Sequence, residues 1–329
     1  MSDRAIKHSR REDGTVVDDD GYSTFVKNPH IAGMEEDVLY HFALSTGTHD
    51  LRAMFGDVKF VCIGGSPRRM EKLAHFLVDE LEYCLPAGQT LTDIAGATDR
   101  YAMYKVGPVL SVSHGMGIPS VSIMLHELIK LVYHAGCEDV TFFRIGTCGG
   151  LGLEPGTVVV SDSTCDGLFN PYLELHVLGK TLQRPGTLDK QIAEALLECS
   201  DPSDDFRTIT GKTMCTLDFY EGQGRLDGAF CDYTDEDKMV FLRKAYNHGV
   251  RNIEMESLCF AAMTHHAGIK GAVVCVSLLD RLKGDQVSTP HDVLSAWQER
   301  PVKIVTRYLR NLLGLPVRDE SSSENIFFP

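Results

Sequence analysis

Residues 101–113 read Tyr-Ala-Met-Tyr-Lys-Val-Gly-Pro-Val-Leu-Ser-Val-Ser, and this stretch decides which class of sheet the chain forms. Two runs rich in β-branched and aromatic residues meet at Val106-Gly-Pro108, where glycine and proline favour a tight turn. The pattern predicts a β-hairpin with strands at 101–106 and 108–113. A hairpin is antiparallel, so a sheet that contains it is mixed rather than purely parallel.

Similar β-branched runs on both sides of the hairpin predict further strands at 58–64, 139–145, 157–162, 207–216, 251–255 and 271–278. The first of these and the runs near 109, 141 and 273 are apolar almost throughout. Central strands that are covered on both faces have this composition. Because longer amphipathic stretches separate the strands, we expect an α/β fold.

Helices are predicted from their start signals and apolar faces. Residues 119–135 begin at Pro119 and form one apolar stripe, made of Val121, Met124, Leu125, Leu128 and Val132. Thr234-Asp-Glu-Asp237 is a cap followed by an acidic first turn, and its helix should end by Gly249. Thr289-Pro290 opens a final helical segment, which Pro301 is expected to break or restart.

The chain is therefore predicted to form a single three-layer α/β domain over residues 28–315, with a central mixed β-sheet flanked by helices. No internal repeat and no Pro/Gly/Ser-rich linker divides this part. Residues 1–27 are polar, include Asp18-Asp-Asp20 and show no apolar period, so we expect a disordered N-terminal tail. Residues 316–329 are expected to form a flexible C-terminal tail.

The charge of the chain excludes several classes of partner. Of 329 residues 46 are acidic and 32 basic, a net charge of -14. Nucleic acids and anionic membrane surfaces would repel such a chain, so neither is expected as a partner. No run approaches the roughly 20 apolar residues of a membrane helix, and the charged start Met1–His8 does not resemble a secretory signal.

The ten cysteines form no C-x-x-C pair. Several lie inside apolar runs, as Cys62 and Cys275 do, where a free thiol acts as a small hydrophobic residue. Reduced core thiols are favoured over zinc ligands or disulfides, which predicts a cytoplasmic (cytosolic) protein.

Two motifs point to metal or cofactor chemistry and are incomplete. His126-Glu127 would need a second histidine at position 130 for a zinc-protease pair, and Lys130 stands there. The glycine-rich residues 146–152 follow a strand but lead into Gly-Leu-Glu-Pro155 instead of a helix, so a dinucleotide fingerprint is absent. We therefore expect neither a metal nor a cofactor.

Two glycine and arginine clusters follow predicted strands and favour phosphate binding. Gly64-Gly-Ser-Pro-Arg-Arg69 supplies open backbone N–H groups and arginine, and Arg144-Ile-Gly-Thr147 supplies a guanidinium and a hydroxyl. Ligands of α/β sheets lie at the carboxyl ends of strands, and guanidinium forks match phosphate oxygens. One such turn alone would be read as a solvated surface turn, whereas two favour phosphate.

Two further clusters indicate a nucleoside. Glu254-Met-Glu256 ends a strand before the apolar helix 257–263, and alternation places Glu254 and Glu256 on one face. A carboxylate there can bind the vicinal diol of a ribose, or it can simply favour the helix N-terminus. Phe219-Tyr-Glu-Gly-Gln-Gly-Arg225 offers a ring, a carboxamide and a guanidinium that suit a pyrimidine, although alone it could be a polar loop.

Taken together, the chain resembles the eukaryotic uridine phosphorylases of the nucleoside phosphorylase-I family over nearly all of residues 29–315. The resemblance is carried by Asn28-Pro29, Leu39-Tyr-His41, Gly64-Gly-Ser-Pro67, residues 97–104, His114-Gly-Met-Gly-Ile-Pro-Ser120, Arg144-Ile-Gly-Thr147, residues 219–228 and Asn252-Ile-Glu-Met-Glu-Ser257. Gln223-Gly-Arg225 is the most specific element, because it separates uridine phosphorylases from relatives that cleave purines.

The resemblance implies a fold like that of the nucleoside phosphorylases and a role for each matching residue. Phosphate would be bound by Gly65, Arg69, Arg144, Thr147 and, from a neighbouring subunit, Arg100. Uridine would be bound by Cys148, Gly149, Phe219, Gln223, Arg225, Met255, Glu256, Leu278, Leu279, Arg281 and, across the subunit boundary, His41. The catalytic set would be Arg69, Arg144, Gln223, Arg225 and Glu256.

The implied reaction is the reversible phosphorolysis of uridine to uracil and ribose 1-phosphate, without metal or cofactor, in a homodimer with shared active sites. One position departs from the family pattern: Cys148 stands where Ser or Thr is usual, and a thiol is the weaker hydrogen-bond donor. A purine nucleoside phosphorylase or nucleosidase of the same fold, and a non-catalytic nucleoside-binding relative, are the alternatives.

Overall fold

The hairpin predicted at 101–113 is present as β6 (Met103–Val106) and β7 (Val109–Ser113), which pair antiparallel with Val106 opposite Val109. Gly107 occupies the turn with φ of +52°, a conformation that favours glycine. The computed structural model describes residues 9–10, 16–17, 26–85 and 87–316. Apart from 9–10, 16–17, 26–27 and 316, the predicted tails 1–27 and 316–329 lie outside the described residues.

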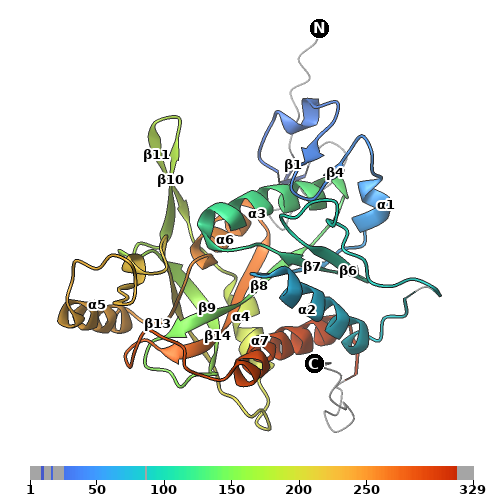
Figure 1. Ribbon diagram of the computed structural model, residues 1–329. Helices are drawn as coiled ribbons and strands as arrows, with labels where there is room; N and C mark the ends of the chain where they lie inside the picture. The colour runs from blue at the N-terminus through green and yellow to red at the C-terminus, as the bar shows by residue number, and fades with distance from the viewer. Residues whose placement is uncertain (1–8, 11–15, 18–25, 86, 317–329) are drawn as a thin grey trace.

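The hairpin forms one edge of an eight-stranded sheet with the order β13-β12-β9-β14-β8-β5-β7-β6 (Figure 1). The other strands are β5 (Phe60–Gly64), β8 (Thr141–Gly150), β9 (Val158–Cys165), β12 (Thr208–Cys215), β13 (Val250–Glu254) and β14 (Lys270–Asp280). β5, β7, β8 and β14 run parallel, whereas β6 and β9 each pair antiparallel with one neighbour. The predicted mixed sheet is confirmed.

One end of the sheet closes on itself. β13 pairs antiparallel with β8 as well as parallel with β12, with Asn252 opposite Gly150 and Ile253 opposite Gly149. Strands β13, β12, β9, β14 and β8 therefore form a closed ring. This closure brings the end of β8 next to the end of β13.

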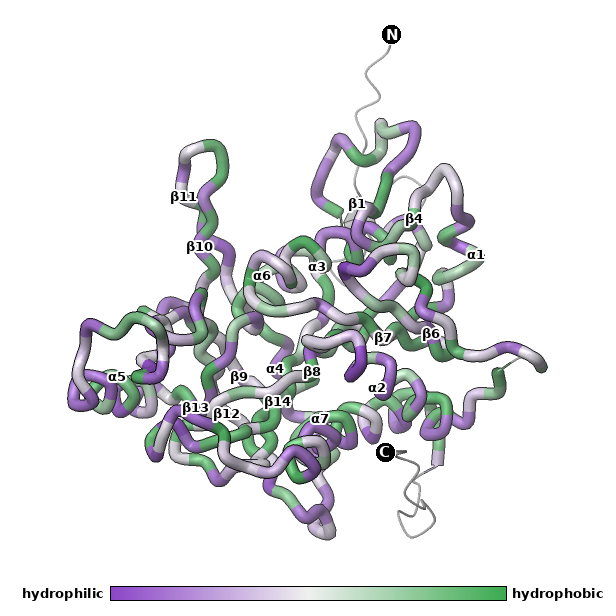
Figure 2. The backbone as a smooth tube through the Cα atoms, in the orientation of Figure 1, coloured by the Kyte–Doolittle hydropathy of each residue, from purple (hydrophilic) through white to green (hydrophobic). Residues whose placement is uncertain are grey.

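Helices cover both faces of the sheet and give the predicted three layers. One face carries α1 (Leu51–Phe55), α3 (Gly117–His134) and α6 (Ser257–Ala267), whose buried residues share one apolar cluster. The other face carries α2 (Pro67–Glu80), α4 (Lys190–Glu198) and α7 (His291–Leu312), whose buried residues share a second apolar cluster. α5 (Asp235–Asn247) packs on a third, smaller cluster with β13. The central strands are correspondingly hydrophobic in Figure 2.

The helix predictions are confirmed except at Pro301. α3 buries the predicted stripe, and α5 begins with a capping box between Thr234 and Asp237. The expected break at Pro301 is wrong, because α7 runs through it without interruption. Proline removes one intrahelical hydrogen bond, but Ile304, Val305 and Leu309 remain fully buried against the sheet and hold the helix together.

Several short elements lie outside the main sheet. β10 (Tyr172–Val177) and β11 (Lys180–Pro185) form a hairpin that projects from the body in Figure 1. Two-residue ladders join β1 (Ser9–Arg10) to β2 (Val16–Val17) and β3 (Val38–Leu39) to β4 (Leu44–Ser45). Short 3₁₀ turns are η1 (Ile31–Gly33) and η2 (Glu221–Gln223).

Candidate active site

The buried guanidinium of Arg144 lies at the centre of the predicted phosphate and ribose site. β8 continues past residue 145 through the Arg-Ile-Gly-Thr motif, which therefore belongs to the strand itself. A Cβ at Gly146 would lie 2.8 Å from Arg144 Nη1, so this glycine provides the space that the guanidinium occupies. Arg144 Nη2 contacts Glu254 Oε2 at 2.8 Å and also the carboxylate of Glu256. Nη1 donates to Cys275 Sγ at 3.0 Å.

The two carboxylates that hold Arg144 come from the junction of β13 and α6. β13 ends at Glu254, so Glu256 precedes α6 instead of continuing the strand, yet both side chains reach the same guanidinium. Glu254 Oε2 accepts from the backbone N–H of Glu256 at 2.9 Å, and Glu254 also accepts from the backbone and the hydroxyl of Ser257. Glu254 thus shapes the turn that presents Glu256.

Burial and the opposite charges of these three groups shift their pKa values. Burial raises the pKa of Glu254 despite the charge of Arg144. Burial also opposes ionisation of Glu256, but Arg144, His114 and the N–H of Gly117, 2.6 Å from Oε1, bring its pKa below the usual value. The pKa of Arg144, which burial would lower, is raised well above its usual range by the two carboxylates. Glu256, whose pKa is lowered, is therefore a charged carboxylate in the site.

The predicted glycine and arginine turn at 64–69 is in part a helix. Ser66 caps α2, its Oγ accepting from the backbone N–H of Arg69 at 3.2 Å, so Arg68 and Arg69 lie in the first helical turn. Arg69 folds back over Gly65, where a Cβ would lie 2.6 Å from Nη2. Burial and the neighbouring charge of Arg144 lower the pKa of Arg69. Arg69 has no ion pair with an acid among the described residues, which leaves a cation available to an anion.

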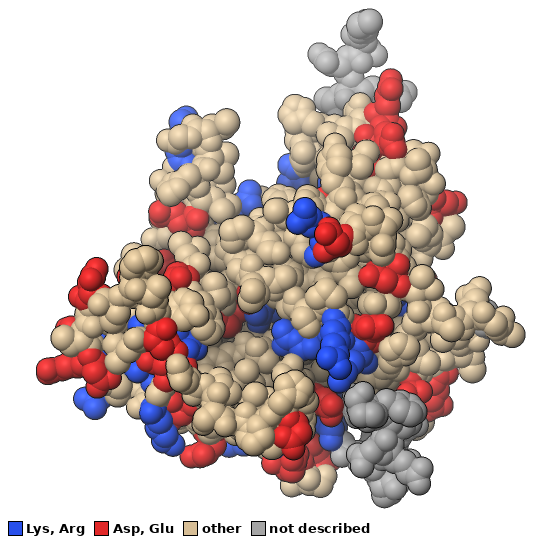
Figure 3. All heavy atoms as spheres, in the orientation of Figure 1, with Lys and Arg blue, Asp and Glu red and all other residues tan. Residues whose placement is uncertain are grey.

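A cavity of about 190 Å³ lies beside this turn, lined in part by Gly64, Ser66, Arg69 and Gly146. Residues of α2 and α7 complete its wall. Lys and Arg side chains gather over these two helices beside a hollow in Figure 3. Positive charge is thus concentrated locally on a chain whose net charge is negative. Thr147, the remaining predicted phosphate residue of β8, is half-buried.

The predicted base-binding residues form a second, connected group. Gln223 and Arg225 are buried at the end of η2, and the Arg225 guanidinium lies 4.0 Å from the centre of the Phe219 ring. Arg281, which is fully buried, donates to the Gln223 carbonyl at 2.9 Å and pairs with Asp285 at 3.0 Å. The structure therefore brings all four predicted residues of this group together, and Asp285 is a partner of both Arg225 and Arg281.

The two groups meet at the end of β8. A Cβ at Gly149 would lie 2.9 Å from Arg281 Cγ and 3.7 Å from Leu279 Cδ2. Cys148 is buried on the same strand, and burial raises the pKa of its thiol well above the usual value. Met255 and Leu278 are half-buried, and Met255 approaches Gly117 at the start of α3.

His41 and Arg100 lie together but apart from these groups. Nδ1 of His41 lies 2.6 Å from Glu127 Oε1. The backbone carbonyl of His41 accepts a hydrogen bond from Thr98 Oγ1 at 3.0 Å. Arg100 follows two residues later, and its side chain is 70 % exposed, with Asp99 as a partner at 3.6 Å. Among the described residues, no hydrogen bond or ion pair joins either residue to Arg144, and their role across a subunit boundary stays a prediction.

Sequence reasoning missed the supporting roles of four residues. These are Glu127, which fixes His41; Glu254, which holds Arg144; Asp285, which joins Lys238, Arg281 and the N–H of Leu226; and His114, beside Glu256. A shared signal was available for the first two. Glu127 lies at helical spacing from Met124 and Leu131, and Glu254 follows the apolar Ile253 in a predicted strand; buried acids in such places require a partner.

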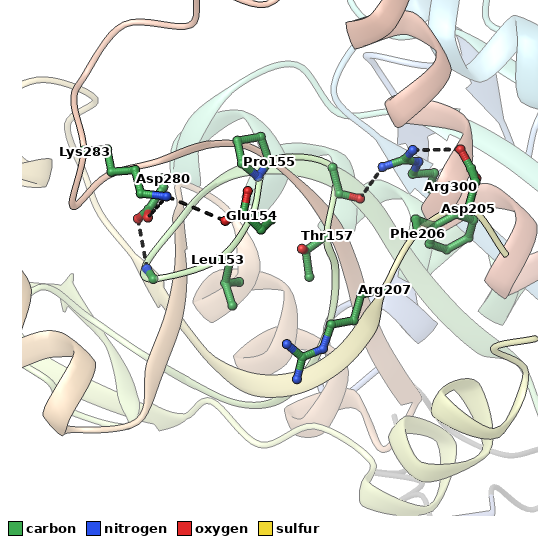
Figure 4. A pocket seen from close by; sticks show the side chains of 12 residues that line it. Leu153, Glu154, Pro155, Thr157, Asp205, Phe206, Arg207, Asp280, Lys283 and Arg300 are labelled. Atoms are coloured by element: carbon green, nitrogen blue, oxygen red, sulfur yellow. Dashed lines mark hydrogen bonds and ion pairs between the residues drawn. The ribbon is translucent and has the colours of Figure 1, made fainter. Parts of the chain in front are cut away.

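A second cavity, of about 340 Å³, lies away from the predicted phosphate residues (Figure 4). It is formed by the loop 152–157, residues 205–207, Asp280, Lys283 and Arg300. Arg300 is engaged there with the Gly156 carbonyl and Asp205, and Lys283 with Glu154 and Asp280. Among the described helices, none is both long enough and apolar enough to cross a membrane.

Comparison with known proteins identifies the family and the fold of the chain. The Phosphorylase superfamily matches residues 59–310. Uridine phosphorylase 1 of Mus musculus is 57% identical over 88% of this chain and 93% of its own length. A crystal structure of uridine phosphorylase from Schistosoma mansoni in complex with thymidine is 41% identical, with a TM-score of 0.84 over 89% of this chain and 100% of that one. The inactive uridine phosphorylase B of Schistosoma mansoni is 40% identical over 89% of this chain and 98% of its own length. The chain belongs to the Phosphorylase superfamily and, within it, to the uridine phosphorylases.

Proposed function

We propose that this protein catalyses the reversible phosphorolysis of uridine to uracil and ribose 1-phosphate, in pyrimidine nucleoside catabolism and salvage. The observation that carries the proposal is the contact of Arg144 with Glu256 beside Arg69, which forms no ion pair with an acid among the described residues. An anion site thereby adjoins a charged carboxylate able to accept hydrogen bonds from a ribose diol. Membership in the uridine phosphorylases supports the same substrate.

Phosphate in this proposal is bound by Arg69, Arg144 and Thr147, with the backbone N–H of Gly65 and Arg100 of a neighbouring subunit. Cleavage of the N-glycosidic bond develops positive charge on the sugar, as in glycoside hydrolysis. A phosphate fixed below C1′ serves both as nucleophile and as countercharge. Positioning of this kind and preorganised charges supply much of an enzyme's rate enhancement.

The ribose is bound by Met255 and Glu256, with His41 from the neighbouring subunit. Glu256 is well suited because Arg144 and Gly117 fix its orientation. It therefore enters the reaction without having to reorganise. Cys148, Gly149, Leu278 and Leu279 line the pocket around the nucleoside.

Uracil is bound by Gln223 and Arg225, with Phe219 packing on the base and Arg281 supporting Gln223. Arg225 Nε is buried and has no hydrogen-bond partner among the described residues, so a donor remains available for a uracil carbonyl. Negative charge develops on the leaving uracil, and a fixed guanidinium stabilises it. Arg69, Arg144, Gln223, Arg225 and Glu256 form the proposed catalytic set.

The active form is proposed to be a homodimer with shared sites, because His41 and Arg100 lie apart from Arg144. Arg100→Ala and Arg225→Ala would then each inactivate both sites of their own dimer. Mixed subunits restore one intact site in each heterodimer, or about a quarter of wild-type activity after random exchange. Failure to recover activity in proven heterodimers would contradict shared sites. The ten free cysteines support the proposed cytoplasmic location.

Release of uracil from uridine by the purified protein, with and without phosphate, tests the proposal. We expect phosphate-dependent release and little turnover of inosine. Preferential inosine cleavage would indicate a purine phosphorylase, and release without phosphate a nucleosidase. Binding of uridine without turnover would indicate a non-catalytic nucleoside-binding protein.

A further inference from the structure

His114 follows β7 at the point where the phosphate turn and the ribose carboxylate approach each other. Its backbone N–H donates to the Gly64 carbonyl at 2.8 Å, and its carbonyl accepts from Ser120 Oγ at 2.6 Å. Three residues later the N–H of Gly117 donates to Glu256. The backbone of His114 is thus fixed by Gly64 and Ser120, three residues before the N–H that orients Glu256.

The side chain has one satisfied and one unsatisfied nitrogen. His114 is 1 % exposed, and Nδ1 lies 3.1 Å from the Gly115 carbonyl. A carbonyl can only accept, so Nδ1 carries the proton and Nε2 presents a lone pair. Nε2 is buried and has no partner among the described residues. An unpartnered buried acceptor is costly, which indicates that something absent from the free chain completes it.

The charges around the ring keep it neutral. Burial, together with the nearby cations Arg144 and Arg69, lowers the pKa of His114 to about 3 against the opposing effect of Glu256. The ring is therefore an acceptor without charge near two guanidinium groups. The carboxylates at the same place are already engaged, Glu254 with Ser257 and Arg144, and Glu256 with Gly117 and Arg144.

We propose that Nε2 of His114 accepts a hydrogen bond from the protonated oxygen of bound monohydrogen phosphate. This inference rests on the phosphate site of the proposed function. Arginines are donors only, so they satisfy the ionised phosphate oxygens but not the P–O–H group. A carboxylate could accept that proton only by placing a negative charge against a dianion. A neutral imidazole accepts it without repulsion.

The arrangement predicts selection of phosphate over sulfate. Sulfate has the same shape and charge but carries no proton at neutral pH, so one of its oxygens would face the Nε2 lone pair. A site that hydrogen-bonds a hydroxyl rejects an analogue that lacks it, because its buried partner stays unpaired. His114 is therefore a residue that determines anion specificity.

Two substitutions test the roles of Nδ1 and Nε2 of His114 separately. His114→Asn keeps an amide near the position of Nδ1, which can still donate to Gly115, and places nothing at Nε2. His114→Gln extends an amide oxygen toward the position of Nε2. For each protein we would measure KM for phosphate, Ki for sulfate, and thermal stabilisation by each anion, which reports binding even without turnover.

Wild type should bind phosphate more tightly than sulfate. His114→Asn should weaken phosphate at least about tenfold and leave sulfate unchanged or tighter, and His114→Gln should recover most of the difference. Equal weakening of both anions in His114→Asn, or no change in either, would overturn the inference. Wild type without phosphate-dependent turnover would instead contradict the proposed function.

Discussion

Replacement of Arg225 by alanine is the most direct test of how the base is held. The substitution removes a guanidinium whose Nη1 donates to the Asp285 carbonyl and which lies 4.0 Å from the centre of the Phe219 ring. It leaves Arg69, Arg144 and Glu256 untouched. The phosphate and ribose contacts should therefore persist while stabilisation of the leaving uracil is lost.

The magnitude follows from the burial of the group, since Arg225 is only 5 % exposed. Loss of one buried, preorganised donor to a developing anion costs about 2–4 kcal/mol at the transition state, or roughly two to three decades in kcat/KM. The Phe219 ring is 43 % exposed, so its cation–π contact contributes about 1 kcal/mol to stability, and a modest decrease in Tm should accompany the loss of activity.

The assay is steady-state release of uracil, with phosphate binding followed separately by thermal stabilisation. Arg251→Ala is a matched control, because Arg251 also lies over a ring, 4.2 Å from the centre of Tyr246, and donates to a backbone carbonyl. It should lose stability and keep its kcat/KM. Normal uridine turnover by Arg225→Ala would refute the assignment, as would an equal loss in Arg251→Ala.

Three further substitutions test particular contacts. Gly146→Ala should raise KM for phosphate about tenfold or more with little change in the far-UV circular dichroism, because its Cβ would lie 2.8 Å from Arg144 Nη1; an unchanged KM would contradict this placement. Asp37→Asn should lower stability at neutral pH, since burial opposes ionisation of Asp37 but its contact with Lys130 lowers its pKa below the usual value. The stability contributed by ionised Asp37 is present above its unfolded pKa near about 4 and is lost as the pH falls through its lowered folded pKa. The free energies of unfolding of wild type and Asp37→Asn, measured by urea titration, should therefore converge at acid pH. Pro301→Ala should raise Tm by restoring one helical hydrogen bond in α7, and a decrease would show that packing of the proline ring matters more.

Local signals in the sequence predicted most of the sheet. The Val106-Gly-Pro108 turn and the apolar runs are short-range features, and β6, β7 and the central strands follow them. α2 was overlooked although Ser66 and Pro67 form a recognisable start and Met70, Leu73 and Leu77 are buried at helical spacing. β10 and β11 were missed because many of their side chains are exposed, so the apolar alternation of a half-buried strand is weak.

In the site, too, local motifs could be predicted from the sequence, whereas contacts made by tertiary packing could not. The residues of the phosphate and base groups lie in compact motifs, and the structure brings each group together. The supporting contacts join distant segments, such as Glu127 with His41 and Arg281 with Gln223. Packing over such sequence separations leaves no periodicity that one sequence can reveal. Continuity of α7 at Pro301 likewise depends on tertiary packing, which outweighs the local preference.

The pairing of β13 with β8 determines how this part of the protein unfolds locally. Because Asn252 and Ile253 pair with Gly150 and Gly149, the strand that carries Arg144 and the turn that carries Glu256 are joined by backbone hydrogen bonds. Neither can separate without breaking the same ladder. Their amide protons should therefore exchange with solvent through one shared opening event, at a rate slower than that of the projecting β10–β11 hairpin. The phosphate and ribose sides of the pocket would then be lost together on partial unfolding.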